Sequence, residues 1–354
     1  MIEKIRLTNF RNFKTKNFNF SDTVTVIIGP NASGKTNILE SVFLLSIGKS
    51  FKAGVEQEII NYNADIARIS GSFGELKLEA ILTRGLIDIG NDHPEKVARK
   101  KLLVNGVPRR LIDFAGNFKA VLFGPWDMDL VTESPSLRRK FLDTVLSVVD
   151  REYRRSILSF EKGVRQRNKL LFRIREEGVP RSQLLFWNQL LIKNGDYITL
   201  KRQEFIEFIN SRLGPQATKY SLKYDRSIIS EGRLAQYSEE EIAAATTLVG
   251  PHRDDFQFQI TNSNLKIKRD LAAFGSRGEQ RMGVLWIKMA ELDFVEKKTG
   301  EKPTLLLDDI FSELDHVHRD IVMEITKSQQ TIVTTADPHF VTGFKKVDKI
   351  ELTG

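Results

Sequence analysis

The chain has 354 residues, a net charge of +8 and no cysteine. This length allows a full hydrophobic core in two lobes, and the lack of cysteine excludes disulfides, thiolate metal ligands and a cysteine nucleophile. No apolar run approaches the roughly 18 residues that a membrane-spanning helix needs, and the first residues lack the apolar stretch of a signal peptide. We therefore expect a cytoplasmic protein without a membrane partner.

The first elements in chain order are two strands and a glycine-rich loop. Residues 2–9 alternate apolar and polar side chains and residues 24–28 form an apolar run, as β-strands do. The loop that follows matches the phosphate-binding pattern G-x-x-x-x-G-K-[S/T] and leads into an expected helix. Its residues are Gly29, Pro30, Asn31, Ala32, Ser33, Gly34, Lys35 and Thr36.

This loop predicts a binding site for a nucleoside triphosphate. Glycines let backbone N–H groups point at phosphates where a helix begins. Lys35 would reach the β- and γ-phosphates, and the Thr36 hydroxyl would bind Mg²⁺. The alternative is a glycine-rich turn without a ligand, which the preceding strand and the following helix disfavour.

Two further β-regions, 66–83 and 101–110, precede a long basic segment; the second turns at Asn105-Gly106, as hairpins do. Residues 136–181 contain 13 Lys or Arg against 6 Asp or Glu, which is nearly the whole net charge. Such a concentration is typical of a surface that binds a polyanion, although an ordinary solvated helix face can look the same. The candidate DNA contacts are Arg138, Arg139, Lys140, Arg151, Arg154 and Arg155.

The same segment predicts two amphipathic helices joined by a short turn at 178–180. Apolar side chains recur at helical spacing from Tyr153 to Ile174 and again from Leu184 to Phe208. Two such helices should form an antiparallel hairpin with arms of roughly 40 Å. Its aromatic side chains are expected to be core residues rather than a platform for bases.

A strand near 218–224 and a helix near 238–247 lead back to two short motifs. The sequence Gly250-Pro251-His252-Arg253 combines a rigid turn with basic side chains, so it is a plausible anion contact. The second motif opens a helix that runs to about Glu296, and a serine and a glycine at a helix start either bind an anion or only cap the helix. Its residues are Ser276, Arg277, Gly278, Glu279 and Gln280.

An apolar strand at 304–307 ends in Asp308 and Asp309. Acidic residues at the carboxyl end of a strand in an α/β sheet are typical Mg²⁺ ligands. Asp308 is the metal candidate, directly or through water, and Asp309 stands where a general base would polarise water. An isolated pair of aspartates can instead cap a helix, but the phosphate loop favours catalytic roles for Lys35, Asp308 and Asp309.

The order of these motifs, closed by Ser312-Glu313-Leu314-Asp315, resembles ABC-type ATPases. In that class the serine motif of one head reaches the γ-phosphate held by a second head. The resemblance therefore implies an ATP-dependent homodimer with two composite sites.

Longer motifs make the chain similar to the RecF family of bacterial recombination mediators along nearly its whole length. They lie at residues 7–13, 48–51, 121–127, 134–143, 250–255 and 306–315. The resemblance implies an α/β ATPase head, lobe I, from residues 1–125 and 216–354. Residues 126–215 would form a helical lobe II that carries a short antiparallel coiled-coil hairpin.

The resemblance also implies function. It implies ATP and Mg²⁺ as cofactors, with Arg11 and Asn12 near ATP and Asp127 near the metal. It implies binding to double-stranded DNA and to single/double-strand junctions, a weak DNA-stimulated ATPase activity, and a cytoplasmic place on the nucleoid. The implied partners are RecR with RecO, which assist RecA loading at gaps.

Three positions depart from the patterns. Asp309 stands where ABC ATPases usually have Glu, which implies slow hydrolysis; Trp126 and Glu279 replace Glu and Gln. An ABC transporter subunit is disfavoured by the basic hairpin, and an SMC-like linker by the short arms. An orphan ABC-type or OLD-like ATPase head with a different partner remains the alternative.

Overall fold

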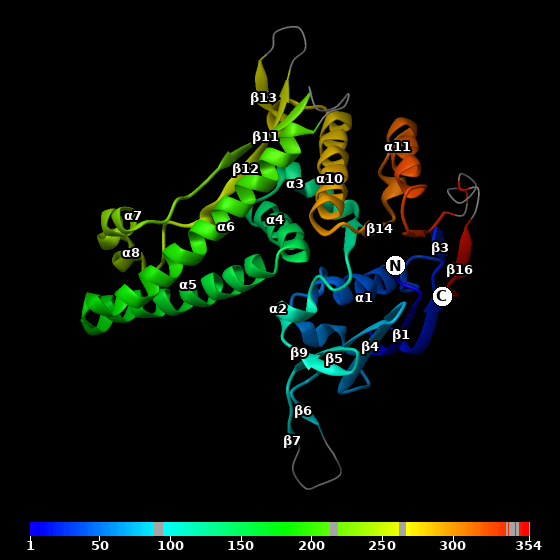
Figure 1. The fold of residues 1–354 in the computed structure, drawn as a ribbon, viewed down its shortest axis with the longest axis horizontal. Coiled ribbons are helices and arrows are strands. Elements are labelled where there is room, and N and C mark those ends of the chain that lie inside the picture. The colour runs from blue at the N-terminus through cyan, green and yellow to red at the C-terminus, as the bar shows by residue number, and fades with distance from the viewer. Residues whose placement is uncertain are drawn as a thin grey trace. The chain divides into compact units, whose positions relative to one another are not determined.

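The computed structural model describes residues 1–87, 95–212, 219–261, 267–337, 339, 344 and 347–353. The chain forms two compact units, the first from residues 1–127 and 295–354 and the second from residues 128–294 (Figure 1). In the part of the chain that the structure describes, no helix has both the length and the apolar character needed to cross a membrane.

The first unit contains a six-stranded antiparallel sheet in the order β2-β1-β4-β5-β8-β9. In β1, Ile5 and Leu7 are buried whereas Lys4 and Arg6 are exposed, so the alternation in the sequence gives the sheet one buried face. The strands are β1 Lys4–Phe10, β2 Phe13–Asn19, β4 Ile66–Phe73, β5 Leu76–Thr83, β8 Lys100–Val104 and β9 Val107–Arg109.

The second sheet of this unit is parallel, in the order β10-β14-β15-β3-β16. Because the strands are parallel, their carboxyl ends meet at one edge of the sheet. The residues that follow β3 and β14 therefore come together there, on either side of β15. The strands are β3 Val24–Ile28, β10 Ala120–Phe123, β14 Thr304–Asp308, β15 Thr331–Thr335 and β16 Asp348–Glu351.

Helix α1 (Lys35–Ile47) packs against strands of both sheets, and its apolar side chains join the main core of the unit. Residues 38–46 of α1 are all buried, which requires such cover on both faces of the helix. The other elements of the first unit are η1 Glu56–Ile59, β6 Leu86–Ile87, β7 Glu95–Lys96, α2 Leu111–Phe114, η2 Pro125–Met128, η5 Ile310–Ser312 and α11 His316–Thr326.

The second unit is built around α5 (Arg151–Glu177) and α6 (Leu185–Ser211), which lie side by side in Figure 1. Gly178 ends α5 with a left-handed backbone (φ 66°), and Gly163 brings the helices close, because a Cβ there would lie 2.7 Å from Leu190. The two helices lie where the apolar periodicity predicts them; the coiled-coil character of the hairpin stays a prediction.

A three-stranded sheet, in the order β11-β12-β13, also belongs to the second unit. Strands β11 and β12 contact α6 and α4 respectively. The expected division assigned residues 216–294 to lobe I; these contacts instead group the described residues from 219 to 294 with the helices. The remaining elements are α3 Asp129–Thr132, α4 Pro135–Val149, η3 Arg181–Leu184, β11 Tyr220–Asp225, α7 Glu231–Gln236, α8 Ser238–Ala244, η4 Pro251–Arg253, β12 Asp255–Thr261, β13 Lys268–Asp270, α9 Leu271–Phe274 and α10 Arg277–Thr299, which crosses the boundary between the units.

Candidate functional site

The loop at residues 29–34 joins β3 to α1 in the first unit. Gly34 has a left-handed backbone with φ 102°, and a Cβ there would lie 2.7 Å from the Phe13 ring and 2.8 Å from the Asn12 amide nitrogen. Both the conformation and the space require glycine at this position. The sequence pattern therefore corresponds to a tight loop that ends at a helix N-terminus.

Lys35 is nearly buried at 8 % exposure, and its Nζ donates to the Gly29 and Pro30 carbonyl oxygens at 2.7 and 3.0 Å. The ammonium group thus lies against the backbone of the loop. The Ser33 Oγ is buried and has no hydrogen-bond partner within the part of the chain that the structure describes. A buried hydroxyl without a partner is costly, so this orphaned oxygen is a second observation that fits a ligand in the loop.

Thr36 and Asp308 are 272 residues apart in the sequence, yet the Thr36 hydroxyl donates to Asp308 Oδ1 at 3.0 Å. The Thr334 hydroxyl donates to the same oxygen at 2.6 Å, because the sheet register places Asp308 beside Thr334. Burial raises the pKa of Asp308, whereas these two hydroxyls and the charges of Lys52 and Lys35 lower it. The sequence gives no sign of the Thr334 contact, which depends on strand register.

Asp309 has a left-handed backbone with φ 49°, which is uncommon for a residue other than glycine and often marks a functional site. Its N–H donates to the Thr334 carbonyl oxygen at 3.2 Å and hydroxyl oxygen at 3.1 Å. Burial raises the pKa of this carboxyl, and the charge of nearby Lys35 lowers it. A role of Asp309 as general base stays a proposal.

Arg11 and Asn12 lie next to the phosphate loop but differ in what they contact. The Arg11 guanidinium donates to both carboxylate oxygens of Glu40 at 2.9 and 2.6 Å. Asn12 donates to the Ser33 carbonyl oxygen at 3.2 Å and accepts from the Asn37 amide at 3.0 Å. Asn12 therefore supports the loop directly, whereas Arg11 pairs with the fully buried Glu40, a partner that sequence reasoning missed.

Asp127 closes the turn that follows β10. Its Oδ2 accepts from the Gly124 N–H at 2.8 Å, and its side chain is 8 % exposed. The neighbouring Trp126 stacks on Phe51, with ring centroids 4.9 Å apart. These contacts give Asp127 a structural task, and a contact between Asp127 and a metal stays a proposal.

The residues at the start of α10 form a capping box in the second unit. The Glu279 carboxylate accepts from the Ser276 N–H at 3.0 Å and from the Ser276 hydroxyl at 3.1 Å, and it pairs with Lys219 at 3.1 Å. Gln280 donates to the Ala272 carbonyl oxygen at 3.2 Å, which ties the turn to α9. Arg277 and Gly278 are exposed, and a Cβ at Gly278 would meet nothing within 4 Å. The serine is thus held by its own helix, and the two residues after it face open space.

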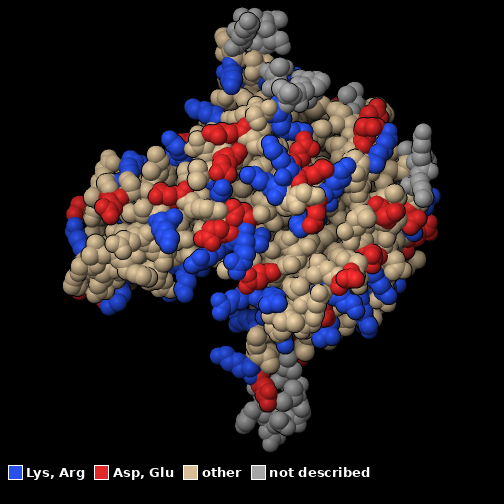
Figure 2. Space-filling model, in the orientation of Figure 1, with Lys and Arg blue, Asp and Glu red and all other residues tan. Residues whose placement is uncertain are grey.

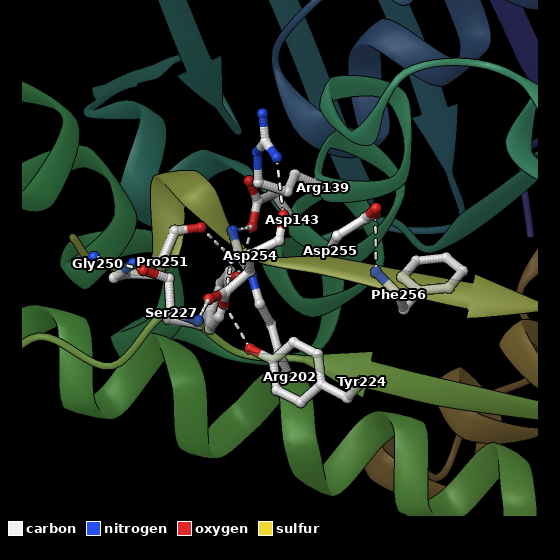
Figure 3. Close-up of polar contacts among 11 residues, drawn as sticks. Arg139, Asp143, Arg202, Tyr224, Ser227, Gly250, Pro251, Asp254, Asp255 and Phe256 are labelled. Atoms are coloured by element: carbon white, nitrogen blue, oxygen red, sulfur yellow. Dashed lines mark hydrogen bonds and ion pairs between the residues drawn. The ribbon is translucent and has the colours of Figure 1, made fainter. Parts of the chain in front are cut away.

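The first two candidate DNA contacts at the start of α4 have structural partners. Arg138 is 9 % exposed and donates to both carboxylate oxygens of Asp255 at 2.6 and 2.9 Å. Arg139 donates to the Asp254 carbonyl oxygen at 2.7 Å (Figure 3). Burial and the charge of Arg202 lower the pKa of Arg139. Arg138 is therefore a buried structural residue, which removes it from the expected DNA surface.

Arg202, on α6, is the centre of a buried polar network (Figure 3). Its guanidinium donates to the Pro251 carbonyl oxygen at 2.6 Å, to Asp254 at 2.9 Å and to Asp143 at 2.7 Å. A further hydrogen bond joins it to the Tyr153 hydroxyl at 3.1 Å. The segment at 250–254 thus anchors the second unit.

His252, in that segment, is unsuited to bind an anion at neutral pH. Burial lowers the pKa of its imidazole to about 4, so the ring is neutral. Its Nε2 lies 3.0 Å from the Thr247 carbonyl oxygen, which the Arg253 guanidinium also contacts at 3.0 Å. His252 and Arg253 thus bind a backbone carbonyl oxygen of the same unit, in place of the anion that the sequence suggested as their partner.

The remaining DNA candidates are Lys140 and three arginines at the start of α5. Arg154 donates to the Ser147 carbonyl oxygen at 2.5 Å, and Arg155 lies 3.5 Å from Glu152 in an exposed ion pair. Lys140 and Arg151 are exposed. Figure 2 shows Lys and Arg interspersed with Asp and Glu over the drawn face. The basic count of the sequence therefore overstates the free charge, because part of it is already paired.

The residues at the sheet edge fit a magnesium ion shared with phosphates. Mg²⁺ prefers hard oxygen ligands and is usually held by one or two side chains together with phosphate oxygens. Asp308 and Thr36 offer a carboxylate and a hydroxyl on adjacent elements, 3.0 Å apart. In the described residues, no group of three or more His, Asp or Glu side chains is arranged to hold a metal alone.

The fold and this arrangement of residues define a P-loop ATPase head of the ABC/SMC type. A family model described as RecF/RecN/SMC N terminal domain matches residues 1–353. The DNA replication and repair protein RecF of Clostridium novyi is 34 % identical over 349 residues, which cover 94 % of this chain and 92 % of that protein. RecF of Halalkalibacterium halodurans is 33 % identical, with 95 % and 92 % covered.

Solved structures of similar proteins support the same family. One described as the recombination mediator protein RecF-ATPrS in the RecFOR pathway has a TM-score of 0.85 and 30 % identity, covering 99 % of this chain and 96 % of that one. The Smc head domain of Pyrococcus yayanosii has a TM-score of 0.52 at 13 % identity, covers 98 % and 94 %, and shares the fold alone. The chain belongs to the RecF family of ABC/SMC-like ATPases.

Proposed function

We propose that the chain binds ATP with Mg²⁺ at the phosphate loop and acts as an ATP-timed DNA-binding protein in recombinational gap repair. The observation that carries this proposal is the contact between Thr36 and Asp308, which joins the loop to the acidic strand. The nucleotide is assigned as ATP because similar structures are described as RecF-ATP, at 30 % identity and a TM-score of 0.82.

Each residue of the site has a separate task in this proposal. Lys35 would hold the β- and γ-phosphates, and Thr36 and Asp308 would hold Mg²⁺, which offsets phosphate charge when bound. Asp309 would polarise the attacking water, and its side chain is one methylene shorter than the usual glutamate. Hydrolysis should therefore be slow.

A single head leaves the γ-phosphate without a signature serine of its own, because ABC-type heads use this motif on a partner's nucleotide. Ser276 and Gly278 of one copy would complete the site of the second copy, so that ATP drives a two-fold homodimer. Lys140, Arg139 and the arginines at 151, 154 and 155 would contact duplex DNA or a single/double-strand junction. The dimer would persist on DNA until hydrolysis, and would assist RecA loading together with RecR and RecO.

The proposal is tested by titrating ATP with Mg²⁺ into the wild type and a Lys35→Ala variant. Loss of a charge-assisted contact to phosphate should weaken ATP binding by about 10- to 100-fold and abolish hydrolysis. Lys16→Ala, an exposed lysine on β2, is the matched control and should bind like the wild type. Equal ATP affinity in all three proteins would contradict the assigned site.

A further inference from the structure

A second basic surface lies toward the C-terminal end of α5, away from the candidate DNA contacts at its start. Arg165, Lys169 and Arg173 are spaced four residues apart, so they share one face of the helix. They line an open groove of about 600 Å³. The other lining residues are Asn168, Phe172, Glu177 and Ala245.

The cations of this groove are available for a ligand. Within the described residues, Arg165 and Lys169 form no hydrogen bond or ion pair and are exposed. Arg173 pairs with Glu177 at 2.9 Å, but both side chains are about half exposed, at 52 % and 51 %. An exposed pair of this kind contributes little energy and exchanges readily with another anion.

Phe172 adds an aromatic surface that the protein core does not use. Its neighbours Leu171 and Ile174 are buried, whereas Phe172 remains 49 % exposed. The Arg175 guanidinium lies over the ring, 5.4 Å from its centroid, in a cation–π contact. An exposed aromatic ring among cations is the usual composition of a site for unpaired nucleic acid.

The floor of the groove is rigid. The Asn168 amide oxygen accepts from the Thr247 N–H at 2.8 Å and from the Thr247 hydroxyl at 2.7 Å. The adjacent residue, Arg167, is 2 % exposed and pairs with the buried Glu241 at 2.6 Å. The exposed cations and Phe172 therefore project from a fixed backbone, which lowers the entropy lost on binding.

The spacing of the cations suits a phosphodiester strand. Steps of four residues place them about 6 Å apart along the helix axis, so that the three span about 12 Å. One strand carries a phosphate per roughly 3.4 Å of axis when stacked. The groove can therefore follow a strand of about four nucleotides.

We propose that this groove binds an unpaired DNA strand, with phosphates on Arg165, Lys169 and Arg173 and one base stacked on Phe172. The inference rests on the proposed DNA-binding function and adds the class of DNA that this part of α5 takes. An unpaired strand is favoured over a duplex because the bases of a duplex are already stacked on each other. Stacking on Phe172 needs a free base face and is tolerant of sequence.

The test measures binding of the full-length protein to a short oligo-dT strand and to a blunt duplex. Phe172→Leu removes the aromatic face but keeps an apolar side chain, and it should weaken oligo-dT binding by about 10-fold. Phe172→Tyr restores an aromatic ring and should bind like the wild type. Phe186→Leu is the matched control, since Phe186 is 64 % exposed on α6 and stacks edge-on against Trp187. Duplex binding should be unchanged in all three variants.

The outcomes separate this inference from the function on which it rests. A wild type that binds neither DNA refutes the proposed function itself. A wild type that binds duplex but not oligo-dT, or a Phe172→Leu variant that binds oligo-dT normally, overturns only the inference. An equal loss of duplex and oligo-dT binding also overturns it. The double variant Lys169→Gln, Arg173→Gln should lower the salt slope for oligo-dT by about 1.4, and an unchanged slope overturns the phosphate contacts.

Discussion

Replacing Arg202 by Met should strongly destabilise the second unit. Arg202 is 1 % exposed, and it donates to Asp143, to Tyr153, to Asp254 and to the Pro251 carbonyl oxygen. Methionine keeps a long apolar stem and removes the charge and all of these donors. The carboxylate of Asp254, which is fully buried, then loses its cation.

The magnitude follows from the partners that remain. Removing one member of a buried ion pair typically costs about 3–5 kcal/mol. Asp254 would still accept from the Tyr224 hydroxyl at 2.5 Å and the Ser227 N–H at 2.7 Å, so we expect the lower end, about 3 kcal/mol. For a unit of this size, that corresponds to a fall in Tm of roughly 6–12 °C.

The loss of folding stability caused by Arg202→Met should also depend on pH. Burial raises the pKa of Asp254 and the charge of Arg202 lowers it, so the substitution raises this pKa further. A carboxyl whose pKa is raised on folding favours the folded state most when it is protonated, and this advantage is lost as pH rises through the folded-state pKa. The free energy of unfolding that Arg202→Met loses relative to the wild type should therefore be smaller at pH 5 than at pH 8.

Urea unfolding followed by circular dichroism at pH 5 and pH 8 measures both effects. Arg173→Met is the control, because it breaks only the exposed pair with Glu177 and should cost less than about 0.5 kcal/mol. A deficit below 1 kcal/mol for Arg202→Met at pH 8 would refute the assigned role of the network. A deficit equal at both pH values would show that packing, rather than the charge of Asp254, is responsible.

Three further predictions concern ligands. Asp308→Asn should remove most of the Mg²⁺ dependence of ATP binding, because the carboxylate that accepts from the Thr36 hydroxyl becomes neutral; a normal Mg²⁺ dependence in ATP titrations would argue against this metal ligand. Glu279→Gln keeps a capping oxygen but removes a negative charge from the α10 N-terminus, which would otherwise repel the γ-phosphate held by a second copy. The association constant with ATP, measured by sedimentation equilibrium, should therefore increase about two- to five-fold, and an unchanged constant would exclude this charge effect. The pair Arg151→Gln and Arg155→Gln should weaken duplex binding equally for unrelated sequences and reduce the salt slope by about 1.8, and an unchanged slope would place the duplex surface elsewhere.

Local motifs in the sequence were enough to predict the phosphate loop and its partner strand. Gly34 needs glycine because its backbone is left-handed, which the loop pattern predicts, and because Asn12 and Phe13 leave no room for a Cβ, which only the fold shows. The approach of Asp308 to Thr36 follows from the general geometry of parallel sheets, without knowledge of this particular chain. Thr334 could not be found in this way, because its contact depends on the register between β14 and β15.

Charge counting was less informative than motif matching. Arg138 and Arg167 count as basic residues in the sequence, but each pairs with a carboxylate far along the chain, Asp255 and Glu241. A sequence window cannot show such pairs, since the partners are 117 and 74 residues away. The same limitation applies to the domain boundary, because the strands after residue 219 pack on helices that precede them.

We propose that ATP joins two copies of the protein through the serine motif at the start of α10. Gly278 gives a clean test, because a Cβ there meets nothing within 4 Å, whereas Ser276 also caps its helix. Sedimentation velocity should show that the wild type is a monomer alone and a dimer with ATP and Mg²⁺. Gly278→Arg should bind ATP with wild-type affinity and yet remain a monomer that does not hydrolyse ATP. A Gly278→Arg protein that dimerises and hydrolyses ATP normally, or a wild type that stays monomeric with ATP, would contradict the proposed ATP-dependent dimer.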